Sequence, residues 1–326
     1  MIKKIAILTS GGDAPGMNPA IRAIVRTAQA NNIETHLVYN GYKGLVEGDI
    51  RPAQSVPLDQ YLNRGGTCIL SARYPEFKEA QVRQLAQQQL HRRGIEALVV
   101  IGGDGSYQGA QLLDALGVKT VALPGTIDND ISSTDFTIGF DTTLNTIVEA
   151  IDRIRDTSRS HGRATIVEVM GRYAGDLAVY SGIATGAELI ITSETKLTPA
   201  AIAQVVNHQI NTLCKDSVVV IVTEHVYPNV HQLAQEIETK TGVCTRATVL
   251  GHIQRGGTPS AMERYLATTM GHFAVQLLMA NKSGLAVGIK NNRLQAIPIL
   301  EALSQPRVSY APTIQEFNLI NQKKIA

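Results

Sequence analysis

The sequence predicts an α/β protein with two domains, each built on a parallel β-sheet. Short apolar runs alternate with helical patterns almost from end to end, and this alternation is typical of βαβ units. The chain has 326 residues, a length that corresponds to about two domains. Because no linker rich in Pro, Gly or Ser divides it, we expect closely packed, crossing connections with a cleft between the domains.

Composition places the chain among ordinary globular proteins. Hydrophobic residues make up 44%, charged residues 18%, and the net charge is +2, so neither nucleic acid nor a membrane is an expected partner. The apolar run near the start ends at Leu8, too short for a signal peptide, and no run reaches the length of about 18 residues that spans a bilayer. Cys68, Cys214 and Cys244 lack metal-ligand spacing, which favours reduced thiols. A cytoplasmic protein is expected.

Apolar runs of four to six residues are the candidate strands. They are Ile5–Thr9, Thr35–Tyr39, Ala97–Ile101, Val118–Leu123, Thr165–Val169, Glu188–Ile191, Val218–Val222 and Ala286–Ile289. The helical pattern is clearest in Asp141–Arg155, where apolar residues mark one face.

The first predicted strand runs into a glycine-rich turn, Ser10 to Asn18. Glycines such as Gly11 and Gly12 let the backbone approach a ligand closely. Asn18 and Pro19 suit the N-cap and the first position of a helix. A strand, a glycine turn and a helix start can bind an anion, although a tight turn without a ligand is about equally frequent.

A second glycine turn carries a carboxylate. It follows the strand that ends at Ile101 and leads into a helix predicted from Gly109 to Leu116. Magnesium prefers one or two carboxylates together with waters and substrate phosphates. Asp104 is therefore placed to hold this ion against phosphates cradled by Gly103, Gly105 and Ser106.

The segment Pro124–Asp130 places two carboxylates and a threonine at the end of a core strand. Ligands of open α/β sheets bind at this edge, where a carboxylate can accept the proton of an attacking hydroxyl. An Asx-rich surface turn is the alternative. Together with both glycine turns, Thr126, Asp128 and Asp130 favour a phosphoryl-transfer site.

Three arginines suit anion binding. Arg73 lies between small residues and a turn, where a guanidinium can reach a phosphate or form a surface ion pair. Arg22 and Arg26 share one helix face, and we expect water or an anion beside them.

Six segments together resemble the bacterial ATP-dependent 6-phosphofructokinases. They are Ser10–Asn18, Ser71–Phe77, Ile101–Ser106, Pro124–Asp130, Ile166–Asp176 and Thr245–Gly257. The resemblance covers nearly the whole chain. It implies two Rossmann-like three-layer α/β domains: a larger ATP-binding domain (1–138 and 251–305) and a smaller fructose 6-phosphate-binding domain (139–250 and 306–326). It also implies a homotetramer.

The implied reaction is the committed step of glycolysis, in which the γ-phosphoryl group of MgATP moves to the 1-hydroxyl of fructose 6-phosphate. Asp128 is then the base, and Thr126 and Asp130 lie beside the transferred group. Arg172 meets the developing charge, helped by Arg73 on the ATP side. Nucleotide residues are Gly11, Arg73, Tyr74, Gly103, Asp104, Gly105 and Ser106, with Asp104 serving Mg²⁺.

The resemblance also implies a set of sugar-phosphate residues. They are Thr126, Asp128, Arg163, Met170, Gly171, Arg172, Glu224, Arg246, His252 and Arg255. Arg163 and Arg246 are expected to come from a neighbouring subunit, although interface ion pairs would be the plainer explanation. His252 could instead be a satisfied core histidine, and Glu224 could be a helix cap.

A second anion site, for ADP or phosphoenolpyruvate, is implied at Arg22, Arg26, Arg155, Glu188 and Lys215. The chain departs from the family there. Ser55, Leu213 and Asp216 stand where well-studied members have cations, so we expect weakened allosteric control.

Glycine at positions 105 and 125 favours ATP as donor, because pyrophosphate-using relatives tend to carry Asp and Lys there. A pyrophosphate-dependent enzyme and a non-catalytic sugar-phosphate-binding homologue remain the alternatives. NAD and diacylglycerol kinases share the Gly-Gly-Asp-Gly loop but lack the block around His252.

Overall fold

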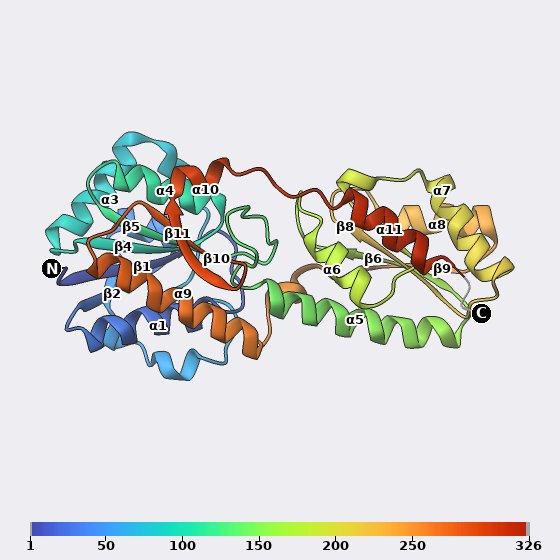
Figure 1. The fold of residues 1–326 in the computed structure, drawn as a ribbon, viewed down its shortest axis with the longest axis horizontal. Coiled ribbons are helices and arrows are strands. Elements are labelled where there is room, and N and C mark those ends of the chain that lie inside the picture. The colour runs from blue at the N-terminus through green and yellow to red at the C-terminus, as the bar shows by residue number, and fades with distance from the viewer. Residues whose placement is uncertain (1, 324–326) are drawn as a thin grey trace. The chain divides into compact units, whose positions relative to one another are not determined.

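The computed structural model describes residues 2–323, which form two compact α/β units. Of these residues, unit 1 comprises 2–142 and Arg255–Arg307, and unit 2 comprises Thr143–Gln254 and 308–323. Each unit contains one β-sheet with helices packed on it (Figure 1). The predicted α/β class is thereby confirmed, while the assignment of each unit to a ligand stays a prediction.

The sheet of unit 1 has the strand order β11-β10-β5-β4-β1-β2-β3. Its strands are β1 (Lys4–Ser10), β2 (Glu34–Val38), β3 (Ile50–Pro52), β4 (Ala97–Gly102), β5 (Lys119–Pro124), β10 (Leu285–Lys290) and β11 (Arg293–Pro298). The five inner strands are parallel, and an antiparallel strand closes each edge. The parallel strands are almost fully buried, as expected for a sheet covered on both faces.

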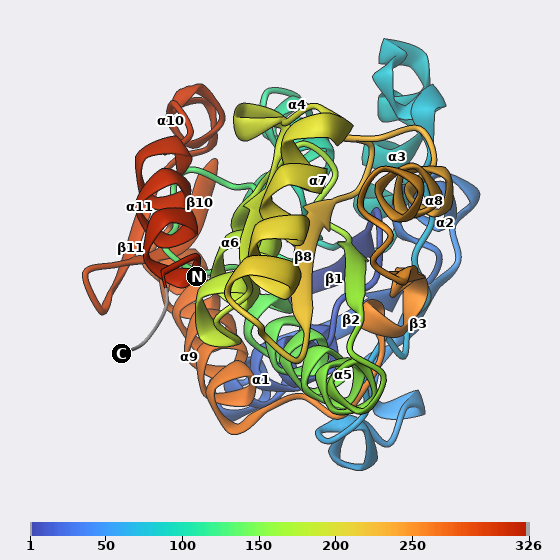
Figure 2. The same ribbon diagram turned by 90° about the vertical axis from the view of Figure 1, so that its right-hand side faces the viewer.

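Helices cover both faces of this sheet. They are α1 (Met17–Ala30), α2 (Gly41–Glu47), α3 (Ala80–Arg92), α4 (Asp104–Asp114), α9 (Ala261–Met279) and α10 (Ile299–Ser304). Residues of α2, α3, α4 and α10 share one core cluster with Leu8, Leu98 and Val100. The helices α1 and α9 lie side by side on the other face (Figures 1 and 2).

Unit 2 contains a four-stranded parallel sheet with the order β7-β8-β6-β9. The strands are β6 (Ala164–Val169), β7 (Leu189–Ile191), β8 (Val218–Thr223) and β9 (Thr245–Val249). The helices are α5 (Phe140–Ser160), α6 (Asp176–Ala184), α7 (Pro199–Asn207), α8 (Val230–Thr241) and α11 (Ala311–Asn321). Helices α7 and α8 share a core cluster with one face of the sheet. On the other face, the Ser158 hydroxyl of α5 lies 2.8 Å from that of Thr165.

The C-terminal helix α11 protects the open edge of this sheet. Asn318 accepts the N–H of Ile190 at 2.8 Å and donates to the Ile190 carbonyl at 3.0 Å. Asn321 donates to the carbonyl of Ala187 at 2.8 Å. Amide side chains thus satisfy backbone groups of β7 that a further strand would otherwise pair, which removes a site for edge-to-edge association.

Several local predictions need correction. Helix α4 begins at Asp104 rather than Gly109, so the second glycine turn is itself the first helical turn. Helix α1 begins at Met17, and Asn18 does not cap it. The Asn18 side chain instead donates to the carbonyls of Arg64 and Gly65, because the adjacent loop needs donors there. The short edge strands β3, β9 and β11 were not predicted.

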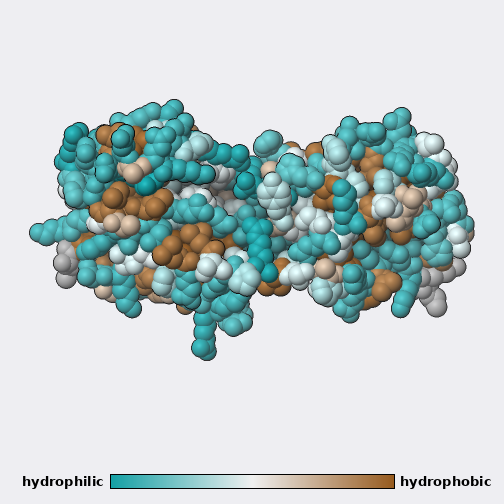
Figure 3. Space-filling model, turned by 90° about the horizontal axis from the view of Figure 1, so that it is seen from above, coloured by the Kyte–Doolittle hydropathy of each residue, from teal (hydrophilic) through white to brown (hydrophobic). Residues whose placement is uncertain are grey.

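Hydrophilic side chains dominate the face of both units seen in Figure 3, and the apolar ones form scattered patches. None of the described helices combines the length and the hydropathy needed to cross a bilayer.

Candidate active site

The glycine-rich turn after β1 contacts the loop that carries Arg73. Gly11 has a φ of 91°, which glycine adopts without strain. Its N–H donates to the carbonyl of Ala72 at 3.4 Å, and the Ser71 hydroxyl donates to the Gly11 carbonyl at 2.8 Å. The predicted nucleotide residues Gly11 and Arg73 therefore lie on adjoining loops. Arg73 is exposed, and Tyr74 packs half-buried against the core.

The second glycine turn presents the N-terminus of α4. Asp104, Gly105 and Ser106 form its first turn, directly after Gly103. Backbone N–H groups and the helix dipole make such a terminus a site for phosphates. Among the described residues, no atom lies within 4 Å of a Cβ built on Gly103 or Gly105, so both glycines border open space.

Side chains behind the first turn of α4 tie it to its neighbours. The Ser106 hydroxyl donates to the carbonyl of Ser10 at 3.1 Å. The hydroxyl of Tyr42 donates to the Ser106 carbonyl at 2.6 Å, and its ring stacks on Phe77 at 4.1 Å. Burial raises the pKa of Tyr42 well above its usual value. Tyr42, which sequence reasoning missed, thus joins this turn to the segment that follows Arg73.

Asp128 lies in a loop closed by its own hydrogen bonds, at the carboxyl end of β5. Its N–H donates to the Thr126 hydroxyl oxygen at 3.2 Å, and the Thr137 hydroxyl donates to the Thr126 carbonyl at 2.6 Å. Asn129, with a φ of 51°, accepts the N–H of Thr137 at 2.9 Å. Asp128 is only 3% exposed. The segment is therefore an Asx-rich turn that also buries a carboxylate at the sheet edge.

Strand register brings the three loops of unit 1 to one level. Ser10 of β1 pairs with Gly102 of β4, and Gly102 pairs with Pro124 of β5. Neighbouring strands lie about 4.8 Å apart. The two glycine turns and the Asp128 loop therefore emerge side by side from the same edge of the sheet.

Two charged side chains of unit 1 already have partners. Asp130 Oδ2 lies 3.5 Å from Arg307 Nη2. Arg255 Nη1 donates to the carbonyl of Asp13 at 3.1 Å. A Cβ built on Gly12 would come within 2.4 Å of the same nitrogen. Arg255, predicted for the sugar phosphate, thus lies against the first glycine turn.

The carboxyl ends of three strands carry most of the predicted substrate residues of unit 2. Met170, Gly171 and Arg172 follow β6, and Glu224 follows β8. His252 follows β9 in the short 3-10 helix η6 (Gly251–Arg255) and is exposed, which excludes a core histidine. Because β8, β6 and β9 are neighbours, the structure brings these residues to one edge.

Glu224 holds the backbone after β6 in an unusual conformation. Gly171 has a φ of 134°, and Arg172 has a φ of 54°, which is uncommon for a residue with a side chain. Both N–H groups donate to Glu224 Oε1, at 3.2 and 2.8 Å respectively. The helix-cap role considered for Glu224 does not apply. Residues held in a strained backbone conformation by their surroundings often mark functional sites. Arg172 is such a residue, and its side chain is exposed.

A second carboxyl group accompanies Glu224. Burial raises the pKa of Glu168, and the negative charge of Glu224 raises it further. His225 and His231 lower it. The edge of unit 2 thus carries acidic and imidazole groups as well as arginine.

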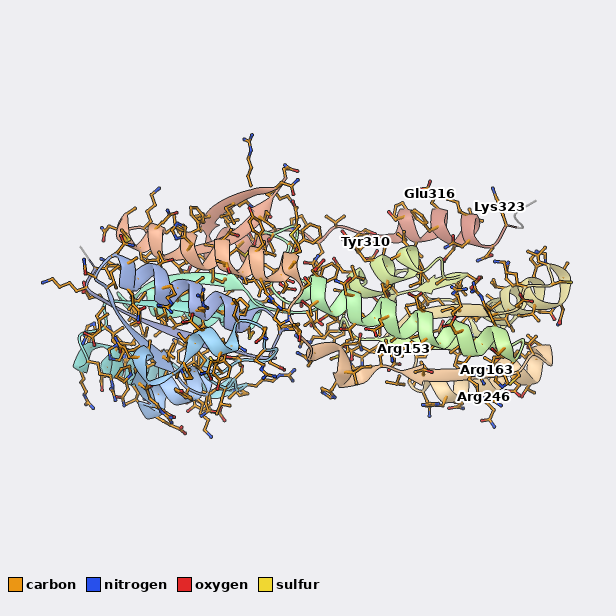
Figure 4. The ribbon with its side chains drawn as sticks, turned by 90° about the horizontal axis from the view of Figure 1, so that it is seen from below. Arg153, Arg163, Arg246, Tyr310, Glu316 and Lys323 are labelled. Carbon is orange, nitrogen blue, oxygen red and sulfur yellow. The ribbon has the colours of Figure 1, made fainter. Side chains whose placement is uncertain are left out.

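Arg163 and Arg246 lie at the amino-terminal ends of the strands of this sheet, opposite the carboxyl ends that carry Arg172 and Glu224. Arg163 directly precedes β6, and Arg246 is the second residue of β9 (Figure 4). Arg163 donates to the Thr157 hydroxyl at 3.1 Å, and Arg246 pairs with Glu238 at 2.9 Å. Because β6 lies between, the structure does not bring these two arginines together with Arg172.

Helix α8 and the open edge of β9 form a shallow polar groove beside Arg246, with a volume of about 500 Å³. Its lining includes His231, Gln235, Glu238 and Thr245. The groove lies wholly within unit 2.

The predicted effector residues form two separate sets. In unit 1, Arg22 Nε lies 2.6 Å from Asp59, and Arg26 pairs with the same carboxylate. Both arginines hold the pKa of Asp59 below its usual value. Where water or an anion was expected beside the two arginines, the structure places the chain's own Asp59, which sequence reasoning missed.

In unit 2, Glu188 is the centre of the second set. Its Oε1 lies 3.5 Å from Arg155 and 3.3 Å from Lys215, and its Oε2 accepts the N–H of Val219 at 2.8 Å. Glu188 is 4% exposed, so the carboxylate is a buried partner of both cations. Lys215 also donates to the carbonyl of Asn321 at 3.0 Å.

Two further buried side chains, Gln254 of η6 and Glu263 of α9, escaped the sequence analysis. Gln254 lies inside a quoted motif, yet its contacts could not be foreseen. Glu263 of α9 accepts the N–H groups of Gly139 and Thr142, at 2.7 and 3.2 Å, next to the start of α5. Burial raises the pKa of Glu263 to about 7, although these hydrogen bonds lower it. Nothing in the sequence distinguished either residue from its neighbours as a candidate site residue.

Among residues 2–323, no group of three or more His, Cys, Asp or Glu side chains is arranged to hold a metal ion. The three cysteines are free thiols.

Comparisons with known proteins give one consistent result. The family model for phosphofructokinase matches residues 4–278. The "ATP-dependent 6-phosphofructokinase" of Mycoplasmopsis pulmonis is 56% identical over 94% of this chain and 94% of its own. That of Mycoplasma mobile is 54% identical over 99% of this chain and 100% of its own. A solved structure of phosphofructokinase from Saccharomyces cerevisiae superposes with a TM-score of 0.86 at 34% identity, covering 98% of this chain and 48% of that one. This chain therefore spans about half the length of the yeast chain. The chain belongs to the phosphofructokinase family.

Proposed function

We propose that this protein transfers the γ-phosphoryl group of MgATP to the 1-hydroxyl of fructose 6-phosphate, giving fructose 1,6-bisphosphate and ADP. The observation that carries the proposal lies in unit 1. Two glycine turns that suit phosphates and the buried carboxylate of Asp128 emerge from adjacent strands β1, β4 and β5. Family membership and relatives named as ATP-dependent 6-phosphofructokinases agree with this chemistry.

The first turn of α4 fits a magnesium–nucleotide phosphate group. Gly103 and Gly105 border open space, and Asp104 adds one carboxylate, the number that magnesium commonly takes from a protein when phosphates and waters supply the rest. Bound Mg²⁺ would neutralise phosphate charge during the transfer. Gly11, Arg73, Tyr74 and Ser106 complete the proposed nucleotide site.

Asp128 is the proposed base. Its carboxylate accepts the proton of the 1-hydroxyl as that oxygen bonds to the γ-phosphorus and the bond to the ADP oxygen breaks. Thr126 and Asp130 lie in the same loop and are proposed to orient the transferred group. Arg172 and Arg73 would stabilise the charge that develops on it.

The sugar phosphate is proposed to bind Met170, Gly171, Glu224, His252 and Arg255. Arg163 and Arg246 lie far from the other proposed sugar-phosphate residues of the same unit. Six strand residues separate Arg163 from Met170, a span of about 20 Å along the strand. We therefore propose that the two arginines serve the site of a neighbouring copy, in a homotetramer with shared active sites.

ATP is proposed as donor in place of pyrophosphate. At Gly105 a side chain would extend into the space left for the nucleotide. At Gly125 a Cβ would meet Ile101 at 2.8 Å and Met17 at 3.1 Å, so the core is built for glycine. Because sugar phosphates and ATP are intracellular metabolites, we also propose that the enzyme works in the cytoplasm.

A coupled assay with ATP, Mg²⁺ and fructose 6-phosphate tests the proposal directly. The Asp128→Asn variant should lose about 100- to 10,000-fold in kcat while its affinity for ATP stays near that of the wild type. Asp135→Asn is the matched control, because Asp135 belongs to the same loop but pairs with Lys290 at 2.8 Å. Full activity in Asp128→Asn, or activity with pyrophosphate and none with ATP, would contradict the proposal.

A further inference from the structure

A glutamine side chain links two of the strand ends that carry the substrate residues of unit 2. Gln254 is fully buried, with 0% exposure. Its Oε1 accepts the N–H of Met170 at 3.0 Å, and its Nε2 donates to the carbonyl of Gly251 at 2.9 Å. The Thr143 hydroxyl donates to the backbone carbonyl of Gln254 at 2.8 Å. The residue thus contacts the end of β6, the turn after β9 and the first residue of unit 2.

The two side-chain bonds use opposite halves of one amide. The oxygen can only accept and the nitrogen can only donate, so Met170 and Gly251 each receive the partner they need. A glutamate of the same shape would place a second acceptor against the Gly251 carbonyl. Neither bond could be replaced by water without opening a fully buried site.

Three consecutive N–H groups after β6 are held from both sides of that strand. Gln254 holds Met170 from the β9 side. Glu224 holds Gly171 and Arg172 from the β8 side. The φ of 54° at Arg172 needs such support, whereas glycine adopts the φ of 134° at Gly171 without strain.

We propose that Gln254 is a positioning residue for sugar-phosphate binding, which rests on the proposed function. It fixes the backbone that presents Met170 to Arg172 and, through Gly251, the neighbouring His252. Gln254 need not touch the substrate, because its polar groups are already paired with the backbone.

The decisive variant is Gln254→Glu, which changes one atom of the amide. The KM for fructose 6-phosphate should rise about 10- to 100-fold, the range expected for a buried hydrogen bond lost at a site. The KM for ATP should stay within about twofold of wild type, because both side-chain hydrogen bonds of Gln254 are made to residues of unit 2. Protonation gives a further signature. A neutral carboxyl can donate to Gly251, so the defect, relative to wild type at each pH, should shrink as the pH falls.

Gln209→Glu is the matched control. Gln209 is also 0% exposed in unit 2, and its Nε2 donates to the carbonyl of Gln322 at 2.9 Å. The same substitution there should lower the melting temperature without changing the KM for fructose 6-phosphate. An equal rise in KM in both variants would overturn the proposal, since general destabilisation would then explain it. So would a folded Gln254→Glu variant with an unchanged KM.

Hydrogen exchange separates this proposal from the proposed function. Without any ligand, the amides of residues 170–172 should exchange faster in Gln254→Glu than in wild type and in Gln209→Glu. Faster exchange in a protein that fails to phosphorylate fructose 6-phosphate would leave the positioning role standing and remove only the assigned substrate. Unchanged exchange in all three proteins would overturn the positioning role itself.

Discussion

Glu224 Oε1 lies 2.8 Å from the backbone nitrogen of Arg172 and receives its N–H. The same oxygen receives the N–H of Gly171. One carboxylate oxygen of a side chain predicted to bind substrate is therefore occupied by the backbone that presents Arg172. The placement of the guanidinium depends on this contact, because Arg172 has a φ of 54°.

Two substitutions of Glu224 separate this support from any contact with the sugar. Glu224→Ala removes the acceptor, and kcat/KM for fructose 6-phosphate should fall about 10- to 100-fold, as expected for charge-assisted hydrogen bonds. Glu224→Gln keeps an oxygen for both N–H groups and should retain clearly more activity. Steady-state kinetics at saturating ATP measures both. Equal losses would mean that the negative charge itself, rather than the backbone support, is what matters.

The space beside Gly105 allows a test of donor choice. An Asp at this position meets no described protein atom at its Cβ and lies in the first turn of α4, where a carboxylate is favourable. Gly105→Asp should therefore fold normally. Its KM for ATP should exceed that of the isosteric Gly105→Asn by about tenfold, because a carboxylate repels phosphates across a few ångströms. Similar KM values for the two variants would show that side-chain size, and not charge, excludes ATP.

A pair of buried tyrosines tests the support of the phosphate turn. Tyr42→Phe keeps the stacking on Phe77 but leaves the Ser106 carbonyl without its donor. We expect a loss of about 1–2 kcal/mol in the free energy of unfolding and a higher KM for ATP. Tyr107 is the control, since its buried hydroxyl has no hydrogen-bond partner among the described residues. Tyr107→Phe should be at least as stable as wild type in urea, with the same KM. Identical behaviour of the two variants would remove any special role of Tyr42.

Stability should depend on pH through Glu263. Burial raises its pKa from 4.5 to about 7 in the folded state. Between these values the folded protein binds more protons than the unfolded chain. The free energy of unfolding should therefore fall by roughly 3 kcal/mol in all as the pH rises from about 4.5 to 7. The pH dependence should be weaker in Glu263→Gln over the same window. Urea titrations of both proteins from pH 5 to 8 measure the difference, and parallel curves would contradict the expectation.

The sequence predicted the fold and the motifs better than the contacts. Buried strands such as Ala97–Ile101 are continuous apolar runs, and glycine turns follow them directly, so local pattern was enough. The edge strand β9 lacks such a run, because its residues are only partly buried. Asn18 was predicted to cap α1 because its type and position fit, but the loop at Arg64 and Gly65 takes up its amide.

Local sequence patterns could not predict the residues that support the site by holding other residues in place. Tyr42 lies 64 positions before the carbonyl it binds, and Gln254 lies 84 positions after Met170. Their roles depend on long-range contacts, which no spacing along the chain encodes. Arg22 and Arg26 show the same limit, since the carboxylate that pairs with them comes from Asp59 in a separate loop.

Allosteric control should be weak, because the cations of the predicted effector site already have carboxylate partners. Arg22 and Arg26 pair with Asp59, and Arg155 and Lys215 pair with Glu188. Positions 55, 213 and 216, at which the resemblance leads us to expect cations, carry neutral or acidic residues instead. The hydroxyl of Ser55 donates to the Pro52 carbonyl, Leu213 is apolar, and Asp216 is an exposed carboxylate. An incoming phosphate would have to displace a bound carboxylate and lie near a further one.

Steady-state rates at subsaturating fructose 6-phosphate measure this control. In the wild type, phosphoenolpyruvate or ADP should shift the half-saturating concentration by less than about fivefold, below the usual range of allosteric coupling. The Asp59→Asn variant frees two arginines in place, and adding Ser55→Arg and Asp216→Lys to it supplies the missing charge. Each step should increase the shift if charge is what the site lacks. Strong sigmoidal inhibition of the wild type by low phosphoenolpyruvate, relieved by ADP, would show instead that the paired cations are released on binding and that the site is intact.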